Sequence, residues 1–201
     1  MKVNITDEII SSAAIKFGIE PGLIYSVCQV ESAGSGFLLS GKPKILFEGH
    51  IFWRQLKLSG MSEIEIEQLA RNHDNILYKK WTRKFYYKDG EREYNRLETA
   101  RLINENAANC SASWGAFQIM GFNYRSCGFN SINDLVIAHS KGIDEHINSF
   151  FNFLISKKLI EHLKNKNWAV FSRMYNGPDY RKNNYDKKLM ERYKEYINSR
   201  T

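Results

Sequence analysis

Apolar residues recur at helical spacing through much of the chain, and one such stretch carries an acidic residue at the edge of its apolar face. This stretch begins at Pro21. Leu23, Val27 and Val30 fall at i, i+4 and i+7, which predicts a helix with one buried stripe. Because proline suits a first helical turn and a glycine follows shortly after Glu31, that residue should lie in the last turn. A carboxyl group there meets little water and the negative end of the helix dipole, which both raise its pKa. Glu31 is therefore a candidate general acid.

The same spacing predicts further helices. They cover about residues 7–17, 51–58, 62–70, 91–109 and 131–157, a segment around Trp168, Phe171 and Tyr175, and residues 183–197. Ser62 and Glu65 have the spacing of a capping box, which marks the start of one helix. Two short apolar runs, 37–39 and 44–48, flank a Gly and Pro turn and predict a small β-hairpin soon after Glu31. Residues 72–90 show no regular pattern, although they contain Trp81, Phe85, Tyr86 and Tyr87 among basic residues.

The composition is that of an ordinary globular domain, which we expect to span residues 1–201. Hydrophobic residues make up 43% and charged residues 25% of the chain, enough for one sizeable core. These patterns predict one α+β domain, mainly α, in which the hairpin lies beside a cleft at Glu31. No apolar stretch is long enough for a membrane-spanning helix or a signal peptide. We therefore expect synthesis in the cytoplasm and no stable membrane insertion.

The net charge and the arrangement of possible metal ligands limit which partners and cofactors the protein can bind. The formal net charge of +7 favours polyanions, such as nucleic acid, an anionic membrane or an acidic cell-wall polymer. The cysteines, Cys28, Cys110 and Cys127, are odd in number and lack CxxC spacing, which argues against a disulfide framework and a zinc site. The histidines form no HExxH motif, and no Cys or Asp completes a set around His139 and His146. We expect neither a metal nor another cofactor.

Two further segments combine glycine, amide and aromatic residues. In residues 113–120, Gly115 falls inside a helical pattern, where glycine costs about 1 kcal/mol relative to alanine. That cost indicates close approach of a ligand or of another backbone. Gln118 lies between apolar neighbours, so its amide should face a groove or a buried partner.

The second of these segments, residues 174–180, combines a helix end with a turn. Tyr175 and Tyr180 bracket Asn176 there. Amide and phenol groups beside an aromatic face suit hydrogen bonding to sugars and stacking on sugar rings.

Four blocks in this order resemble one enzyme family. They are VESAGSGF at residues 30–37, GKPKILFEGH at 41–50, SWGAFQIMGFNY at 113–124 and YNGPDY at 175–180. Together they resemble the phage-endolysin N-acetylmuramidase domain family, which belongs to the lysozyme-like superfamily with goose-type lysozymes and lytic transglycosylases. The sequence departs from the family pattern at Gly49, where a larger residue is common.

The resemblance implies a lysozyme-like fold and a peptidoglycan hydrolase. Such an enzyme cleaves the β-1,4 bond between N-acetylmuramic acid and N-acetylglucosamine, and Glu31 is the matching catalytic acid. We expect seven residues of the matching blocks to bind substrate: Ser32, His50, Gly115, Gln118, Tyr175, Asn176 and Tyr180.

The second catalytic group stays open at this point. Glycoside hydrolysis usually uses two carboxyl groups, and Glu48, at the end of the extended segment, is the best second candidate. Asp179 is a weaker one, since an Asp after a proline more often caps a helix. If Glu31 acts without a second carboxylate, the acetamido group of the substrate can assist, and the product is then the anhydro sugar of a lytic transglycosylase.

A non-catalytic module that binds cell wall or nucleic acid is the alternative. No nucleic-acid-binding motif is present, and binding alone gives no reason for a carboxyl group on an apolar helix face. We therefore expect peptidoglycan as the partner, no nucleic acid, and a monomer. A holin-type partner would release the protein to the cell wall. The sequence leaves open whether it is a phage lysis protein, a tail component or a secreted effector.

Overall fold

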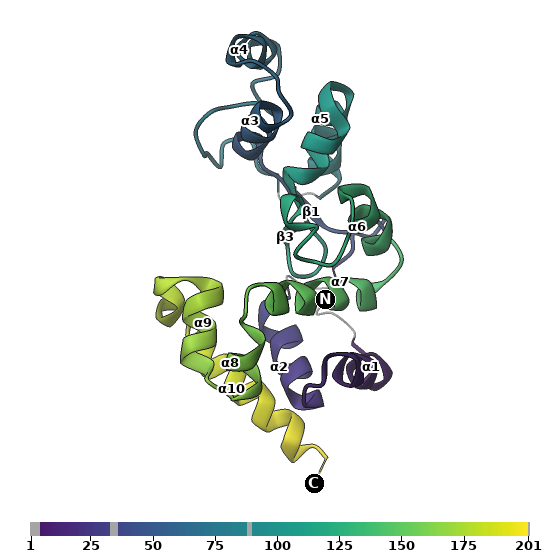
Figure 1. Ribbon diagram of the computed structural model, residues 1–201, viewed down its shortest axis with the longest axis vertical. Coiled ribbons are helices and arrows are strands. Elements are labelled where there is room, and N and C mark those ends of the chain that lie inside the picture. The colour runs from purple at the N-terminus through teal and green to yellow at the C-terminus, as the bar shows by residue number, and fades with distance from the viewer. Residues whose placement is uncertain (1–4, 33–35, 88–89, 201) are drawn as a thin grey trace.

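The computed structural model describes residues 5–32, 36–87 and 90–200, and Figure 1 shows two lobes with one helix between them. The sheet lobe comprises β1 (Ile45–Phe47), α3 (Gly49–Leu58), α4 (Glu63–Asn72), α5 (Gly90–Cys110), β2 (Ala112–Trp114), β3 (Ile119–Met120), η1 (Gly121–Asn123) and α6 (Ile132–His139). The helical lobe comprises α1 (Asp7–Phe17), α2 (Pro21–Glu31), α8 (Ile160–Lys164), α9 (Trp168–Asn176), η2 (Pro178–Asn183) and α10 (Tyr185–Asn198). The helix between them is α7 (Ile143–Ser156). The predicted α+β fold, mainly α, is confirmed.

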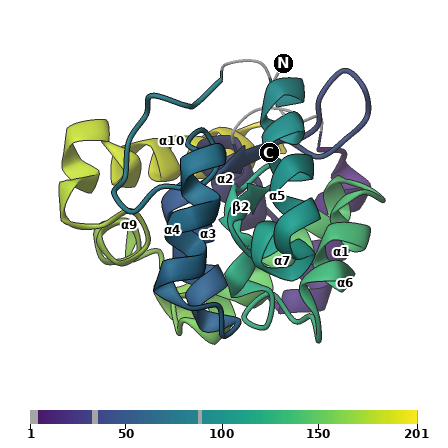
Figure 2. The same cartoon turned by 90° about the horizontal axis from the view of Figure 1, so that it is seen from above.

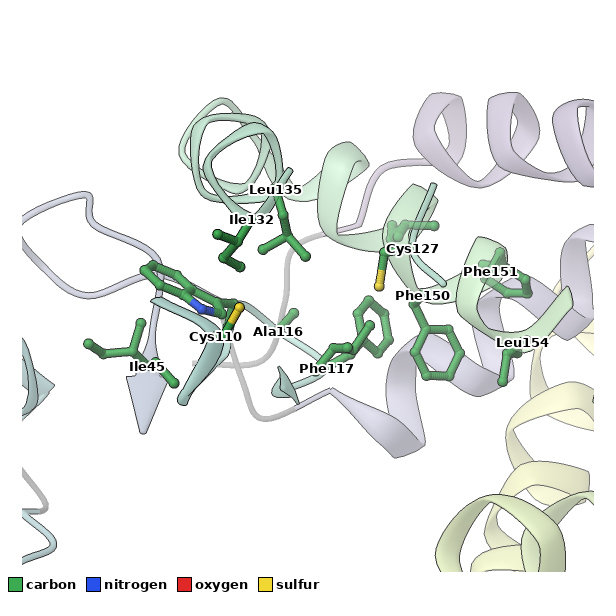
Figure 3. Close-up of a cluster of buried hydrophobic side chains, with 14 of the residues drawn as sticks. Ile45, Cys110, Ala116, Phe117, Cys127, Ile132, Leu135, Phe150, Phe151 and Leu154 are labelled. Atoms are coloured by element: carbon green, nitrogen blue, oxygen red, sulfur yellow. The ribbon is translucent and has the colours of Figure 1, made fainter. Parts of the chain in front are cut away.

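Aromatic side chains on α7 hold the lobes together. Phe150 stacks on Phe117 of the sheet lobe, with ring centroids 4.3 Å apart, and meets Tyr175 of α9 edge to face at 5.4 Å. Its neighbour Phe151 stacks on Phe17 of α1 at 5.3 Å. Figure 3 shows Phe117, Phe150 and Phe151 within one buried cluster. The position of each lobe therefore depends on its packing against α7.

The helix starts that the sequence predicts from residues close together in the chain agree with the structure. The Ser62 hydroxyl accepts a hydrogen bond from the Glu65 backbone N–H at 3.3 Å, and the Glu65 carboxylate accepts one from the Ser62 N–H at 2.8 Å. This reciprocal pair is the predicted capping box. Pro21 is the first residue of α2, as predicted. The glycine expected to end α2 falls in residues 33–35, outside the described residues.

Two long helical predictions are wrong in detail. The segment 91–109 is interrupted at Asn104, which has φ −160° and ψ 106°. The Asn104 side-chain oxygen accepts a hydrogen bond from the Ala107 N–H at 2.9 Å, so it starts a new helical turn instead of extending the apolar stripe. The segment 131–157 forms two helices, α6 and α7, because Gly142 is fully extended at φ 176° and ψ 171°.

The predicted hairpin or extended pair is present only as a short antiparallel bridge, and the main strand partner of β1 lies elsewhere. Strand β1 pairs antiparallel with β2 in the register Ile45↔Trp114, and β2 pairs with β3. The run 37–39 contributes an isolated bridge between Phe37 and Pro43 instead. The Lys44 N–H donates to the Gly36 carbonyl at 2.8 Å beside this bridge, and the Gly41 N–H donates to the Leu38 carbonyl at 3.1 Å, which closes the turn. Proline lacks a donor, so the pairing goes no further at Pro43. The strand partner of β1 therefore comes from far along the chain.

Within residues 5–32, 36–87 and 90–200, no helix combines the length and apolar character needed to cross a bilayer.

Candidate active site

Glu31 is the last residue of α2 and is half-buried. The preceding turns bury Leu23, Ile24, Val27 and Cys28, so the helix packs tightly and holds the carboxyl group against the protein. Burial raises the pKa of Glu31 to about 7, while a hydrogen bond from Asn176 and the charge of Lys188 oppose this rise. A large fraction of Glu31 is therefore protonated at neutral pH, as a general acid requires.

Asn176 ends α9 and reaches Glu31 from the other side. Its side-chain N–H donates a hydrogen bond to Glu31 Oε1 at 3.1 Å. The next residue, Gly177, has φ +84°, which suits glycine and lets the chain turn away. Tyr175 stacks on Phe171 at 5.9 Å, and its pKa is raised by burial and by the nearby Glu31 charge. The segment predicted to contact sugars thus brings Tyr175 and Asn176 next to the acid.

A cavity of about 720 Å³ opens beside these residues, between the two lobes. Its lining comes from the β2–β3 region (Phe117, Gln118, Ile119, Met120, Asn123), from α7 and the turn after it (Phe153, Lys157, Leu159) and from α9 (Met174, Tyr175, Asn176). Asn176 both lines this cavity and bonds to Glu31. The cavity mixes aromatic and amide groups and has a volume that suits one or two sugar rings.

The segment 113–120 is a hairpin, which corrects the prediction that Gly115 lies in a helix. Gly115 has φ +72°, and a Cβ atom there would lie 2.8 Å from His146 Nδ1. The glycine therefore serves the approach of a side chain in the interior. Gln118 Nε2 donates to the Gly115 carbonyl at 2.8 Å, and Gln118 Oε1 accepts from the Ser113 hydroxyl at 2.9 Å. The amide of Gln118 thus fixes the hairpin that forms one cavity wall.

Glu48 lies in a different cluster from Glu31. It follows β1 and accepts a hydrogen bond from the Tyr86 hydroxyl. His50 Nδ1 is 3.3 Å from the Glu48 carboxylate, and burial lowers the pKa of His50. The structure thus joins Glu48 and His50 to each other and to the connection between α4 and α5.

Two other predicted residues, Ser32 and Tyr180, differ in their exposure. Ser32 follows α2 with an extended backbone and is half-buried. Tyr180 is 5% exposed, and its hydroxyl accepts a hydrogen bond from Arg181 Nε at 3.1 Å. Tyr180 therefore supports η2 from inside the helical lobe.

Comparison with known proteins decides the family. The sequence pattern of the N-acetylmuramidase family matches residues 20–197. The chain belongs to this family. The crystal structure of the Burkholderia AP3 phage endolysin is similar, with a TM-score of 0.86 and 35% sequence identity, over 98% of this chain and 72% of that one. No curated protein matches the chain. The predicted resemblance is confirmed, and the protein is a lysozyme-type peptidoglycan hydrolase.

Two histidines, His139 and His146, support the hairpin formed by residues 113–120 of this muramidase. The sequence suggested them only as possible metal ligands. His146 Nδ1 accepts a hydrogen bond from the Ala116 N–H at 3.1 Å, and its Nε2 donates to the His139 carbonyl at 2.8 Å. His139 Nε2 lies 2.9 Å from the Ser149 hydroxyl, which itself donates to the Glu145 carbonyl. Both rings are buried and neutral, since burial lowers the pKa of His139 to about 3 and also lowers that of His146.

These contacts explain why the histidines carry no sequence signal. The seven-residue interval between the two histidines contains the break between α6 and α7. The partner of His146, Ala116, is 30 residues away along the chain. In the part of the chain that the structure describes, no group of three His, Cys, Asp or Glu residues is arranged to hold a metal ion. The three cysteines are buried and free.

Proposed function

We propose that this muramidase cleaves the β-1,4 bond between N-acetylmuramic acid and N-acetylglucosamine, with Glu31 as the general acid. The observation that carries this proposal is the half-buried Glu31 carboxyl group, whose pKa is raised to about 7 and which is bonded to Asn176, a residue that lines a sugar-sized cavity. A protonated acid beside the cleaved bond supplies the proton that the leaving oxygen needs.

The first step breaks the bond between C1 and the glycosidic oxygen. Protonated Glu31 gives its proton to that oxygen, and the positive charge that develops at C1 is taken up by the acetamido oxygen of the same sugar. Water then attacks C1, the acetamido group leaves, and the Glu31 carboxylate accepts the proton of the water. Asn176 keeps the carboxyl group in position during both steps, through its hydrogen bond to Oε1.

The substrate's acetamido group is favoured over Glu48 as the second group because of the contacts of Glu48. Its carboxylate is already bonded to the Tyr86 hydroxyl and lies against His50. Glu48 as second carboxylate is the alternative route to hydrolysis. A lytic transglycosylase is the other candidate, and the pairing of Glu31 with an amide, Asn176, suits it equally well. In that reaction the sugar's own 6-hydroxyl, instead of water, attacks C1.

The test is a product analysis by mass spectrometry of purified peptidoglycan digested in heavy-oxygen water. We expect fragments with N-acetylmuramic acid at the reducing end, each with one heavy oxygen at C1. Fragments with anhydro ends and no heavy oxygen would show that the enzyme is a lytic transglycosylase and not a hydrolase. Fragments with N-acetylglucosamine at the reducing end would overturn the assignment of the bond.

We also propose that the protein acts as a monomer and reaches the wall after release by a holin-type partner. Its similarity to a phage endolysin supports this route. Expression of the chain alone should leave host cells intact, and co-expression of a protein that makes holes in the inner membrane should lyse them. Lysis by the chain alone would exclude the need for such a partner.

A further inference from the structure

The connection between α4 and α5 has no helix or strand in its described part, residues 73–87. Connections of this length inside a domain are uncommon and usually functional. Its inner side is fixed, because Ile76 and Leu77 are fully buried in the core. The Tyr87 N–H donates a hydrogen bond to Glu93 Oε1 at 2.8 Å, which ties the far end to α5.

The middle of this loop is attached to the segment that follows β1. The Tyr78 hydroxyl accepts a hydrogen bond from the Gly49 N–H at 3.2 Å. A Cβ atom at Gly49 would lie 2.4 Å from the Tyr78 ring, so the glycine leaves room for this contact. Tyr86 donates a hydrogen bond to Glu48, and the Trp81 side chain lies near the Tyr86 hydroxyl, where it acts to lower the pKa of Tyr86. Trp81 thus lies beside a hydroxyl that is itself bonded to Glu48, the residue that follows β1.

The outer side of the loop is aromatic and basic. Trp81 is 58% exposed, and the Arg83 guanidinium lies 5.5 Å from its ring centroid. Lys80 and Lys84 are exposed as well. Lys79 differs, because it pairs with two glutamates of α4 at 2.9 and 2.6 Å. We call Lys80, Trp81, Arg83 and Lys84 the loop platform.

The connection between α4 and α5 lies on the same side of the molecule as α9. Figures 1 and 2 both place the α4–α5 connection on the side from which α9 projects, and α9 carries the cavity residues Met174, Tyr175 and Asn176. A glycan strand that extends from the cavity toward the sheet lobe would pass along this side of the molecule. Stem peptides extend outward from such a strand and bear free carboxylates, which complement the three cations.

We propose that the loop platform binds the stem peptides of the peptidoglycan strand next to the cut, with its cations on peptide carboxylates and Trp81 stacked on a sugar ring. This inference rests on the proposed function for its substrate. In this proposal, the exposed residues of the loop select the glycan strands that carry stem peptides. Stacking suits the indole ring, since more than half of the Trp81 side chain is exposed.

The test measures binding without cleavage. Glu31→Gln protein is sedimented with insoluble peptidoglycan, so that a failure of the proposed cutting reaction does not affect the result. Trp81→Ala should weaken binding about 10-fold, and Trp81→Tyr should recover much of it. The triple variant Lys80→Gln, Arg83→Gln, Lys84→Gln should weaken binding about 10-fold at low salt and much less at high salt. Circular dichroism checks that each variant is folded.

The matched control removes the same charge elsewhere. Lys16, Lys141 and Lys194 are exposed lysines of α1, the α6–α7 connection and α10, and their triple change to Gln should have less than a third of the effect. Equal losses in both triple variants would overturn the proposal, because net charge would then suffice. An unchanged affinity of Trp81→Ala would overturn the stacking contact.

A second substrate identifies the ligand group. Carbodiimide coupling to ethanolamine turns the stem-peptide carboxylates into neutral amides and leaves the glycan intact. On this material the loop variant and the control variant should bind alike. A loop-specific loss that persists there would exclude the stem peptides as the ligand. Binding to vesicles of anionic phospholipid that depends on Trp81, with peptidoglycan binding unchanged, would assign the loop platform to a membrane surface instead.

Discussion

Glu31 and Glu48 are half-buried glutamates at the ends of two elements, yet their surroundings differ. Glu31 ends α2, where burial raises its pKa to about 7 and the cavity residue Asn176 donates a hydrogen bond to it at 3.1 Å. Glu48 follows β1, where it accepts a hydrogen bond from Tyr86 and lies 3.3 Å from His50. The difference shows how surroundings divide the work: one carboxyl group is prepared to exchange a proton, and the other attaches a loop.

Replacing each glutamate by glutamine gives the largest expected contrast. Glu31→Gln should lower the rate of release of reducing ends about 1,000-fold, because glutamine has the same shape and no acidic proton. Glu48→Gln should lower it about 10-fold and should also lower the melting temperature, since it weakens the bond to Tyr86. Glu191→Gln, at an exposed position of α10, serves as the control and should act like the wild type. Equal losses for Glu31→Gln and Glu48→Gln would make Glu48 the second catalytic carboxylate.

Tyr86→Phe tests the hydrogen bond between Tyr86 and Glu48, and its effect should be of intermediate size. It removes the hydroxyl that donates to Glu48 and should cost about 1 to 2 kcal/mol of unfolding free energy, measured in urea. Because the loop is then less well held, KM should rise more than kcat falls. Tyr124→Phe is the matched change, since that hydroxyl contacts the exposed Arg125 and should matter little. Equal stability of the two variants would show that the Glu48 bond holds nothing in place.

The two glutamates also show how far sequence reasoning reaches. The position of Glu31 follows from Leu23, Val27 and Val30, which are close neighbours on one helix, and the structure agrees. The partner of Glu48 is 38 residues away in a loop without periodicity, and no local pattern points to it.

The same contrast holds for the rest of the fold. The capping box at Ser62 was predictable because its partners are three residues apart. The pairing of β1 with β2 was not, since Leu46 and Ser113 are separated by 67 residues. Gly115 shows a further limit, because the sequence alone does not distinguish a glycine in a helix from a glycine in a turn at φ +72°.

The pH dependence should reflect Glu31. Activity needs the protonated carboxyl group, so it should be full in mild acid and fall as the pH rises through about 7. Stability should follow the same group, because its pKa rises from 4.5 to about 7 on folding. Its stabilising contribution is then present below pH 4.5 and is lost as the pH rises through 7. Urea unfolding of the wild type and Glu31→Gln across this range should show this loss in the wild type alone.

Asn176→Ala sharpens the assignment of that pH dependence. The amide favours the ionised form of Glu31, so its removal should move the fall in activity to higher pH, along with a lower maximal rate. The measurement is kcat against pH for both proteins. A fall at the same pH in the variant would mean that another group controls the rate.

The smallest expected effect comes from Lys188, an exposed residue of α10 whose charge lowers the pKa of Glu31. Lys188→Met should move the fall in activity slightly to higher pH at low salt. High salt should move the wild type in the same direction, because screening weakens an interaction that passes through solvent. Lys187→Met is the matched control, since Lys187 belongs to the same helix turn but lines a different pocket with Trp168 and Met190. Equal shifts in the two variants would trace the effect to net charge, whereas a shift confined to Lys188→Met, and abolished by salt, would show that α10 adjusts the acid from outside the cleft.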